Sequence, residues 1–128
     1  MKIAGCVGCE TCHHTGDGCV VEDEMQKLYP LFEEAQMVVL ASPIYYFGFS
    51  SQLAAMMSRW YPTMRPKAKK YALILSAYSE GAYQYAETQY HRMIADFGAE
   101  DCGTLMFYGK RQKTEENLER VRILAANL

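Results

Sequence analysis

The sequence predicts an α/β fold in three layers, in which a parallel β-sheet lies between helices. Three continuous apolar runs in the chain are typical of strands that a parallel sheet buries on both faces. Each run precedes a segment whose apolar residues recur at helical spacing. Because strands that alternate with helices favour parallel pairing through right-handed crossovers, we expect one helix followed by three strand–helix units.

The first helix is expected after an acidic stretch at residues 22–24, whose carboxylates suit a helix N-terminus. Apolar residues follow at helical spacing, and Pro30 predicts a break or a second helix start. The first strand is expected at residues 37–41, Met-Val-Val-Leu-Ala, where no polar residue alternates with the apolar ones. This strand is therefore predicted to be buried on both faces.

The helix after the first strand is expected to begin at two serines. Ser50 and Ser51 can cap its N-terminus, because a serine hydroxyl accepts a hydrogen bond from a free backbone N–H of the first turn. One apolar stripe then follows, formed by Leu53, Met56, Met57 and Trp60. This stripe predicts packing against the rest of the protein.

Two further strand–helix units follow. Residues 71–75 predict the second strand, and residues 83–97 predict a long helix that Gly98 ends. Residues 103–108 predict the third strand, and Thr114 is expected to cap the final helix. The apolar residues of that helix expected to face inward are Leu118, Val121, Leu124 and Leu128, the last of which lies outside the residues described below.

Length and composition indicate one globular domain. The chain has 128 residues, of which 50% are hydrophobic and 22% are charged, so a disordered chain is excluded. The net charge is −2, and the short cluster Lys67, Lys69 and Lys70 is typical of a solvated strand entry. No apolar run reaches the ~18 residues of a membrane helix. We expect a single domain over residues 1–128, with a cysteine-rich loop (1–21) before an α/β body (22–128), and neither nucleic-acid nor membrane partners.

Four cysteines lie close together near the start of the chain, spaced C-x2-C-x2-C-x6-C. Cys6, Cys9, Cys12 and Cys19 can converge on one centre, and the glycines between them allow the backbone to bend tightly. Thiolates gathered this closely repel one another, so they need a metal, a cluster or oxidation. No secretory signal is visible, and a cytoplasmic location, where thiols stay reduced, is expected.

Several chemistries can account for these cysteines. Cys9 to His13 matches the C-x-x-C-H haem motif, and zinc can be held by three thiolates with Cys19 or His13 as the fourth ligand. Disulfides and an empty, reduced loop are further alternatives. An iron–sulfur cluster fits best, although the last spacing and Val20 in place of proline differ from a ferredoxin module.

Two loops at the carboxyl ends of the first two strands suit a flat aromatic ligand. Ligands of such sheets bind at this edge, and the loops 42–50 and 76–83 supply aromatic faces, hydroxyls and glycines that permit close approach. Ordinary packing of the aromatic residues at the strand end is the alternative. The candidate ligand-binding residues in these loops are Pro43, Ile44, Tyr45, Tyr46, Phe47, Gly48, Ser76, Ser79 and Gly81.

The combination resembles the flavodoxin-like NAD(P)H-dependent FMN reductases and, among them, the iron–sulfur flavoproteins. The resemblance rests on the cysteine spacing followed by Val-Val-Glu-Asp-Glu-Met, on Val-Val-Leu-Ala-Ser-Pro-Ile-Tyr-Tyr-Phe-Gly at 38–48, and on the helix 51–59. In that helix the family usually has a lysine and an acidic residue where this chain has Ala54 and Ser58. The resemblance implies FMN held by residues 43–48 and 76–81, beside a 4Fe–4S cluster held by the four cysteines.

The resemblance also implies an oxidoreductase that transfers electrons from NAD(P)H, or from a ferredoxin-like donor, through the flavin. No acid–base or nucleophilic residue is singled out as catalytic. The alternative is a non-enzymatic electron carrier that binds a cluster or zinc but no flavin.

The start of the chain departs from the family pattern. Members begin with a strand, a phosphate-binding loop, a helix and a second strand, and the sequence has none of these before Cys6. We therefore expect an N-terminally truncated flavodoxin-like fold. Without a neighbouring strand, the run 37–41 would leave an apolar edge open, which favours a homo-oligomer. The alternative is that the segment 1–21 folds back and shields this edge.

Overall fold

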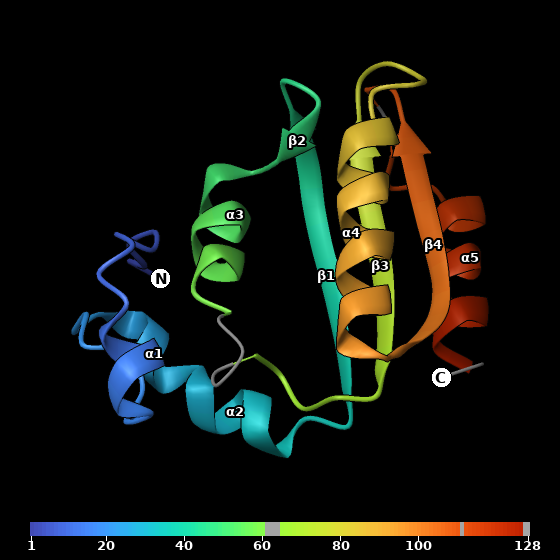
Figure 1. The fold of residues 1–128 in the computed structure, drawn as a ribbon. Helices are drawn as coiled ribbons and strands as arrows, with labels where there is room; N and C mark the ends of the chain where they lie inside the picture. Colours follow the sequence, from blue (N-terminus) through green and yellow to red (C-terminus); the bar gives the residue numbers. More distant parts are fainter. Residues whose placement is uncertain (61–64, 111, 127–128) are drawn as a thin grey trace. The chain divides into compact units, whose positions relative to one another are not determined.

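The computed structural model describes residues 1–60, 65–110 and 112–126, and the chain divides into two compact units (Figure 1). The cysteine unit comprises Met1–Gln36 and Ser51–Ala68, and the sheet unit comprises Met37–Ser50 and Lys69–Leu128. A single domain over residues 1–128 stays a prediction. Within the described ranges, no helix combines the length and apolar character that crossing a membrane requires.

The sheet unit contains a four-stranded sheet in the order β2-β1-β3-β4. Strands β1 (Met37–Tyr45), β3 (Lys70–Ala77) and β4 (Glu100–Tyr108) are parallel, which confirms the predicted parallel sheet. Strand β2 (Gly48–Phe49) is antiparallel to β1 and was not predicted. The chain reverses after Tyr45, so the segment expected to be a loop from residue 42 onward is partly strand.

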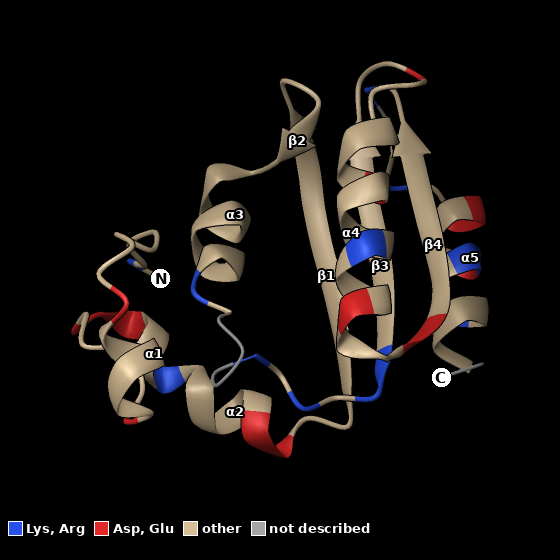
Figure 2. Ribbon diagram, viewed as in Figure 1, with Lys and Arg blue, Asp and Glu red and all other residues tan. Residues whose placement is uncertain are grey.

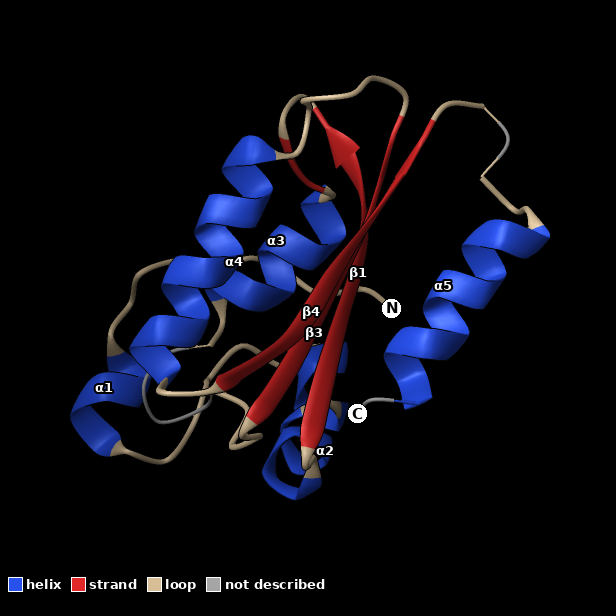
Figure 3. Cartoon of the chain, turned by 90° about the vertical axis from the view of Figure 1, so that its right-hand side faces the viewer, coloured by secondary structure: helices blue, strands red, loops and turns tan. Residues whose placement is uncertain are grey.

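Helices cover both faces of this sheet, so the sheet unit has the predicted three layers (Figure 3). Helix α4 (Gln84–Phe97) lies on one face and helix α5 (Glu115–Ala126) lies on the other. On the α4 side, the core includes the fully buried Leu73, Leu75, Ala86 and Tyr90. Leu73 and Leu75 lie in the apolar run that predicted the second strand, and Ala86 and Tyr90 stand at the helical spacing that predicted the long helix.

The ends of both helices follow the expected capping chemistry. Gly98 ends α4 in the left-handed conformation, with φ 61°, which glycine adopts without steric cost. The Thr114 hydroxyl accepts a hydrogen bond from the Asn117 N–H at 3.2 Å, as an N-cap does. The inward orientation expected for Leu118 is wrong, because 43% of this residue is exposed. Helix α5 packs on β4 without burying any described residue completely.

Strand β1 is not buried on both faces. Leu40 and Ser42 are buried, whereas Val39 is 45% exposed and Ala41 is also exposed. The expectation failed because α5 packs against β4, two strands away from β1, and leaves this part of the sheet face open. Within the described residues, the edge of Met37–Pro43 that faces away from β3 pairs with no other strand.

The cysteine unit consists of short helices. It contains α1 (Thr11–Thr15), the 3-10 helix η1 (Glu24–Lys27), α2 (Tyr29–Glu34) and α3 (Ser51–Ser58). The second helix start predicted at Pro30 is confirmed, since Pro30 lies in the first turn of α2. Helix α1 was not predicted, because five residues are too few to show a helical period.

Charged residues of both signs are spread over the elements of each unit (Figure 2). The lysines before β3 include Lys67, which forms an ion pair with Glu33, and Lys69, which is exposed. Lys67 and Lys69 thus lie as expected for a solvated strand entry, whereas Lys70 is half-buried at the start of β3.

Candidate functional site

The carboxyl ends of β1 and β3 border a cavity of about 380 Å³ in the sheet unit. The turn after β1 and the loop between β3 and α4 supply its walls. The cavity therefore lies at the edge of a parallel sheet where such folds bind ligands. The lining residues are Ile44, Tyr46, Phe47, Ala77, Tyr78, Ser79, Glu80, Gly81 and Ala82.

The structure brings together only part of the predicted ligand-binding set. Ile44, Tyr46, Phe47, Ser79 and Gly81 line the cavity. The other predicted residues are placed in the strands and do not belong to the lining. Pro43 pairs with Ser76 in the parallel register of β1 and β3, and Tyr45 pairs with Gly48 in the β1–β2 hairpin.

The turn between β1 and β2 holds two aromatic residues in a strained conformation. Tyr46 and Phe47 have φ values of 50° and 70°, which L-residues rarely adopt. Such conformations cost on the order of 1–3 kcal/mol each and cluster at functional sites. The side chains are not ordinary core, because Tyr46 is 98% exposed and Phe47 is 52% exposed. The turn therefore presents exposed aromatic surface at this edge of the sheet.

Further aromatic residues surround this turn and were missed from the predicted set. Tyr78 lines the cavity and is 71% exposed. The Tyr85 ring lies 6.2 Å from the Phe47 ring, measured between centroids, and Tyr85 is also exposed. The signal in the sequence is the recurrence of tyrosines just after the second strand and at the start of the next helix.

A buried tyrosine anchors the start of α4 beside the cavity. The Tyr83 hydroxyl donates a hydrogen bond to the Phe107 carbonyl oxygen at 2.9 Å. Burial raises the pKa of this tyrosine to about 12. Tyr83 therefore stays protonated at neutral pH and holds the β3–α4 loop against β4.

The four clustered cysteines lie in the cysteine unit as free thiols. Cys6 and Cys9 are exposed, whereas Cys12 and Cys19 are half-buried. Sulfur atoms in this segment receive hydrogen bonds, from the Gly8 N–H to Cys6 at 3.4 Å and from the Thr11 hydroxyl to Cys9 at 3.6 Å. The Thr11 backbone N–H and hydroxyl lower the pKa of the Cys9 thiol, which favours the ligating thiolate form.

The donor set fits a thiolate-ligated centre, but the thiols do not converge. Nowhere in ranges 1–60, 65–110 and 112–126 do three or more Cys, His, Asp or Glu side chains form a group that could hold a metal ion. Cys102, which lies in β4 outside this group of four, is a half-buried free thiol.

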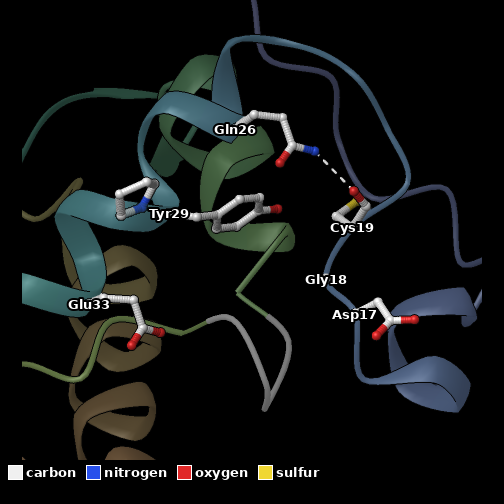
Figure 4. Close-up of a pocket in the computed structure, with 7 residues that line it drawn as sticks. Asp17, Gly18, Cys19, Gln26, Tyr29 and Glu33 are labelled. Carbon is white, nitrogen blue, oxygen red and sulfur yellow. Dashed lines mark hydrogen bonds between the residues drawn. The ribbon is translucent and has the colours of Figure 1, made fainter.

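A second cavity of about 390 Å³ lies beside Cys19 in the cysteine unit (Figure 4). The Gln26 amide donates to the Cys19 carbonyl oxygen at 2.9 Å and closes one side. The Tyr29 side chain points toward Cys19 from α2, and burial raises the pKa of its hydroxyl. The residues that line this cavity are Asp17, Gly18, Cys19, Gln26, Tyr29, Pro30 and Glu33.

Asp23, which follows the four cysteines in the chain, contacts Ala4, which precedes them. Its carboxylate accepts hydrogen bonds from the Ala4 N–H at 2.8 Å and the Met25 N–H at 2.9 Å, and it pairs with Arg59 at 3.0 Å. The Ala4 N–H, with smaller contributions from Met25 and Arg59, holds the pKa of Asp23 below its usual range.

Fold and site together define a flavodoxin-like α/β protein with an aromatic cavity at the carboxyl edge of its sheet. The model of the NADPH-dependent FMN reductase family matches residues 2–98. The chain therefore belongs to this family, and membership favours a flavoprotein over an electron carrier without flavin.

Part of the chain is also similar in sequence to proteins named iron-sulfur flavoproteins. The chain is 43% identical over 61 residues to an iron-sulfur flavoprotein of Archaeoglobus fulgidus, covering 48% of this chain and 27% of that protein. It is 35% identical over 61 residues to iron-sulfur flavoprotein MJ1083 of Methanocaldococcus jannaschii, covering 48% of this chain and 31% of that protein. The matches thus span about a third or less of these relatives.

A solved structure shares the fold. The Trp repressor binding protein of Bacillus subtilis aligns with a TM-score of 0.63 and 20% identity, covering 84% of this chain and 71% of that one. At this identity the likeness shows the flavodoxin-like fold alone.

The hydrogen bond between the Ala4 N–H and the Asp23 carboxylate should persist in mild acid. A carboxyl whose pKa is lower in the folded state stabilises the fold fully above its unfolded value of about 3.9, and this stabilisation is lost as the pH falls through the lowered folded pKa. We expect the Asp23 carboxyl carbon in an NMR titration to have its midpoint below about 3.9, and the Ala4 amide resonance to move with it.

The Asp23→Asn variant should abolish the movement of the Ala4 resonance in this acid range, whereas Asp17→Asn in the exposed part of the segment should leave it unchanged. An Asp23 midpoint at or above the ordinary aspartate value would contradict the assignment of the Ala4 contact.

Proposed function

We propose that the protein is a redox flavoprotein that binds FMN in the cavity at the carboxyl ends of β1 and β3. The observation that carries the proposal is the strained, exposed aromatic turn at this edge of the sheet, in a chain whose residues 2–98 match the NADPH-dependent FMN reductase family. NAD(P)H is the proposed electron donor, and a ferredoxin-like protein is the second candidate.

The lining chemistry suits a flat, largely apolar ring system. Tyr46, Phe47 and Tyr78 offer ring faces for stacking, and the Ser79 hydroxyl offers a polar contact. Gly81 adopts φ 83° with open space where a side chain would stand, so the loop backbone can approach a ligand closely. These features support a ring bound between the β1–β2 turn and the β3–α4 loop.

Bound FMN would supply the electron-transfer chemistry, and the chain would supply position and surroundings. Tyr46 and Tyr78 would orient the ring and shield one side from water. Tyr83, protonated and anchored on Phe107, would keep the β3–α4 loop in place. We assign the residues of the lining a binding role and no proton-transfer step.

We also propose that Cys6, Cys9, Cys12 and Cys19 ligate one centre, a 4Fe–4S cluster, with zinc as the alternative. The hydrogen bonds to the Cys6 and Cys9 sulfurs support thiolate ligation. The names of the iron-sulfur flavoprotein relatives also support it. Because the thiols do not converge, binding would include an ordering of the segment. A thiolate-ligated centre of this kind agrees with a cytoplasmic setting.

An assembly of two copies is proposed from the open edge of β1. Val39 and Ala41 are exposed, and the unpaired edge of Met37–Pro43 offers backbone hydrogen-bonding groups. A second copy is the simplest partner, since two-fold pairing covers the same surface on both chains.

Removal of one exposed aromatic ring should weaken FMN binding without unfolding the protein. In Tyr46→Ala, the loss of a stacking face should raise the FMN dissociation constant about tenfold, equivalent to about 1.4 kcal/mol. Quenching of FMN fluorescence measures this constant, and circular dichroism checks the fold. Tyr45→Ala, which alters the neighbour outside the lining, should have a smaller effect. Wild-type affinity in Tyr46→Ala, or a larger loss in Tyr45→Ala, would contradict the placement.

The cysteine proposal predicts different results for two serine variants. After anaerobic purification, the wild-type protein and Cys102→Ser should contain iron and acid-labile sulfide, whereas Cys12→Ser should lose both because one ligand is missing. Elemental analysis and a sulfide assay make the comparison. Zinc without sulfide would establish the zinc alternative. A wild-type protein with neither metal nor sulfide would contradict the shared centre.

Sedimentation equilibrium tests the assembly. We expect a dimer mass at micromolar concentrations, and Val39→Lys should shift the mass toward the monomer, because a charge at an apolar edge disfavours pairing. The matched change Ile123→Lys, on the exposed surface of α5, should leave the mass unchanged. A concentration-independent monomer mass for the wild-type chain would exclude the dimer.

A further inference from the structure

Arg59, directly after α3, is the most deeply buried charged residue of the described chain. Only 2% of the residue is exposed, although a guanidinium is charged at any ordinary pH. Burying an unpaired charge is strongly unfavourable, so the surroundings must supply acceptors. The positions of these acceptors show which parts of the chain the Arg59 side chain joins.

The guanidinium reaches acceptors on both sides of the four cysteines. Its Nη1 donates to the Ala4 carbonyl oxygen at 3.1 Å, shortly before Cys6. Its Nη2 donates to the Val21 carbonyl oxygen at 3.3 Å, shortly after Cys19. Nη1 also pairs with the Asp23 carboxylate at 3.0 Å. One side chain therefore joins the two ends of the cysteine segment, which we define as residues 4–23.

Other contacts close the same segment. The Asp23 carboxylate accepts the Ala4 N–H, so Ala4 is held through both its backbone groups. Beyond these residues, the Glu24 N–H donates to the Lys2 carbonyl oxygen at 3.3 Å, and the Lys2 N–H donates to the Glu24 carboxylate. The ends of the segment are thus tied while its cysteines stay accessible.

The residue before Arg59 adds a contact at the first cysteine. The Cys6 N–H donates to the Ser58 hydroxyl oxygen at 2.9 Å, and the Ser58 hydroxyl donates to the Ala55 carbonyl oxygen at 2.6 Å. Arg59 also lies beside the Tyr29 hydroxyl, which points toward Cys19 (Figure 4). The end of α3 therefore contacts the backbone of Cys6 and lies beside the tyrosine that points toward Cys19.

We propose that Arg59 is a positioning residue, which closes the cysteine segment and thereby holds the four thiols within reach of one centre. The proposal rests on the thiolate centre of the proposed function. Arginine suits this role because its rigid fork donates in several directions at once, whereas a lysine ammonium on a flexible stem cannot span the same three acceptors. Residues that orient metal ligands without binding the metal typically lower its affinity about 10–100-fold when they are replaced. We expect an effect of this order here.

The test compares Arg59→Gln and Arg59→Lys with the exposed control Arg92→Gln in α4, all in the full chain. Cobalt(II) added to the reduced protein reports thiolate ligation through its charge-transfer absorption. Hydrogen exchange of the Ala4 and Cys6 amides reports the closure independently of any metal. Should Arg59→Gln not fold, as judged by circular dichroism, Arg59→Lys decides, because it keeps a cation beside Asp23 and loses the fork.

We expect the cobalt dissociation constant to rise about 10–100-fold in the Arg59 variants. The Ala4 amide should exchange at least about tenfold faster, and Arg92→Gln should match the wild type in both. Wild-type cobalt affinity in the Arg59 variants would overturn the positioning role, whether or not amide exchange accelerates. A wild-type chain that binds no cobalt through its thiols would instead contradict the thiolate centre, and the positioning role would fail with it.

Discussion

The parallel pairing of β1 with β3 is the interaction on which the candidate flavin site depends. Leu40 pairs in register with Leu73, and Ser42 with Leu75, so the buried face of one strand continues into the other. This register brings the turn after β1 and the loop after β3 to the same edge of the sheet. Residues more than thirty positions apart then line one cavity. The pairing of β1 with β2 on either side of Tyr46 and Phe47 holds these two residues in their strained conformation.

The cysteine unit follows a different principle, because short helices offer little apolar surface to pack. A single buried guanidinium and its carboxylate partner join the beginning and end of the segment, and the thiols between them keep their freedom. Closing the segment at its ends restricts the chain between them and so lowers part of the entropy cost of ordering it. Under the proposed thiolate centre, the thiols between the closed ends would be ordered when the centre binds.

The parts that the sequence predicts are those with a uniform pattern. The helix 83–97 repeats one period over many residues, and the runs 37–41 and 71–75 are continuously apolar, which is typical of strands in a parallel sheet. Strand β2 and helix α1 are too short for any period, and Val39 is exposed because covering a strand depends on where a distant helix packs. The candidate site was predictable in the same limited way, because the positions of its loops follow from the ends of the strands. That Tyr46 lines the cavity and Tyr45 does not depends on the chain reversal after Tyr45, which the sequence did not predict. Arg59 gives no signal in the sequence, since its partners lie far along the chain.

Binding of FMN at the edge where β1 and β3 end is the central proposal. A heteronuclear NMR titration of the protein with FMN tests this binding residue by residue, because every backbone amide reports separately. We expect saturable shifts concentrated in residues 44–48 and 77–82, with the amides of α5 unchanged. Shifts centred on other elements, or an unchanged spectrum at millimolar FMN, would contradict it.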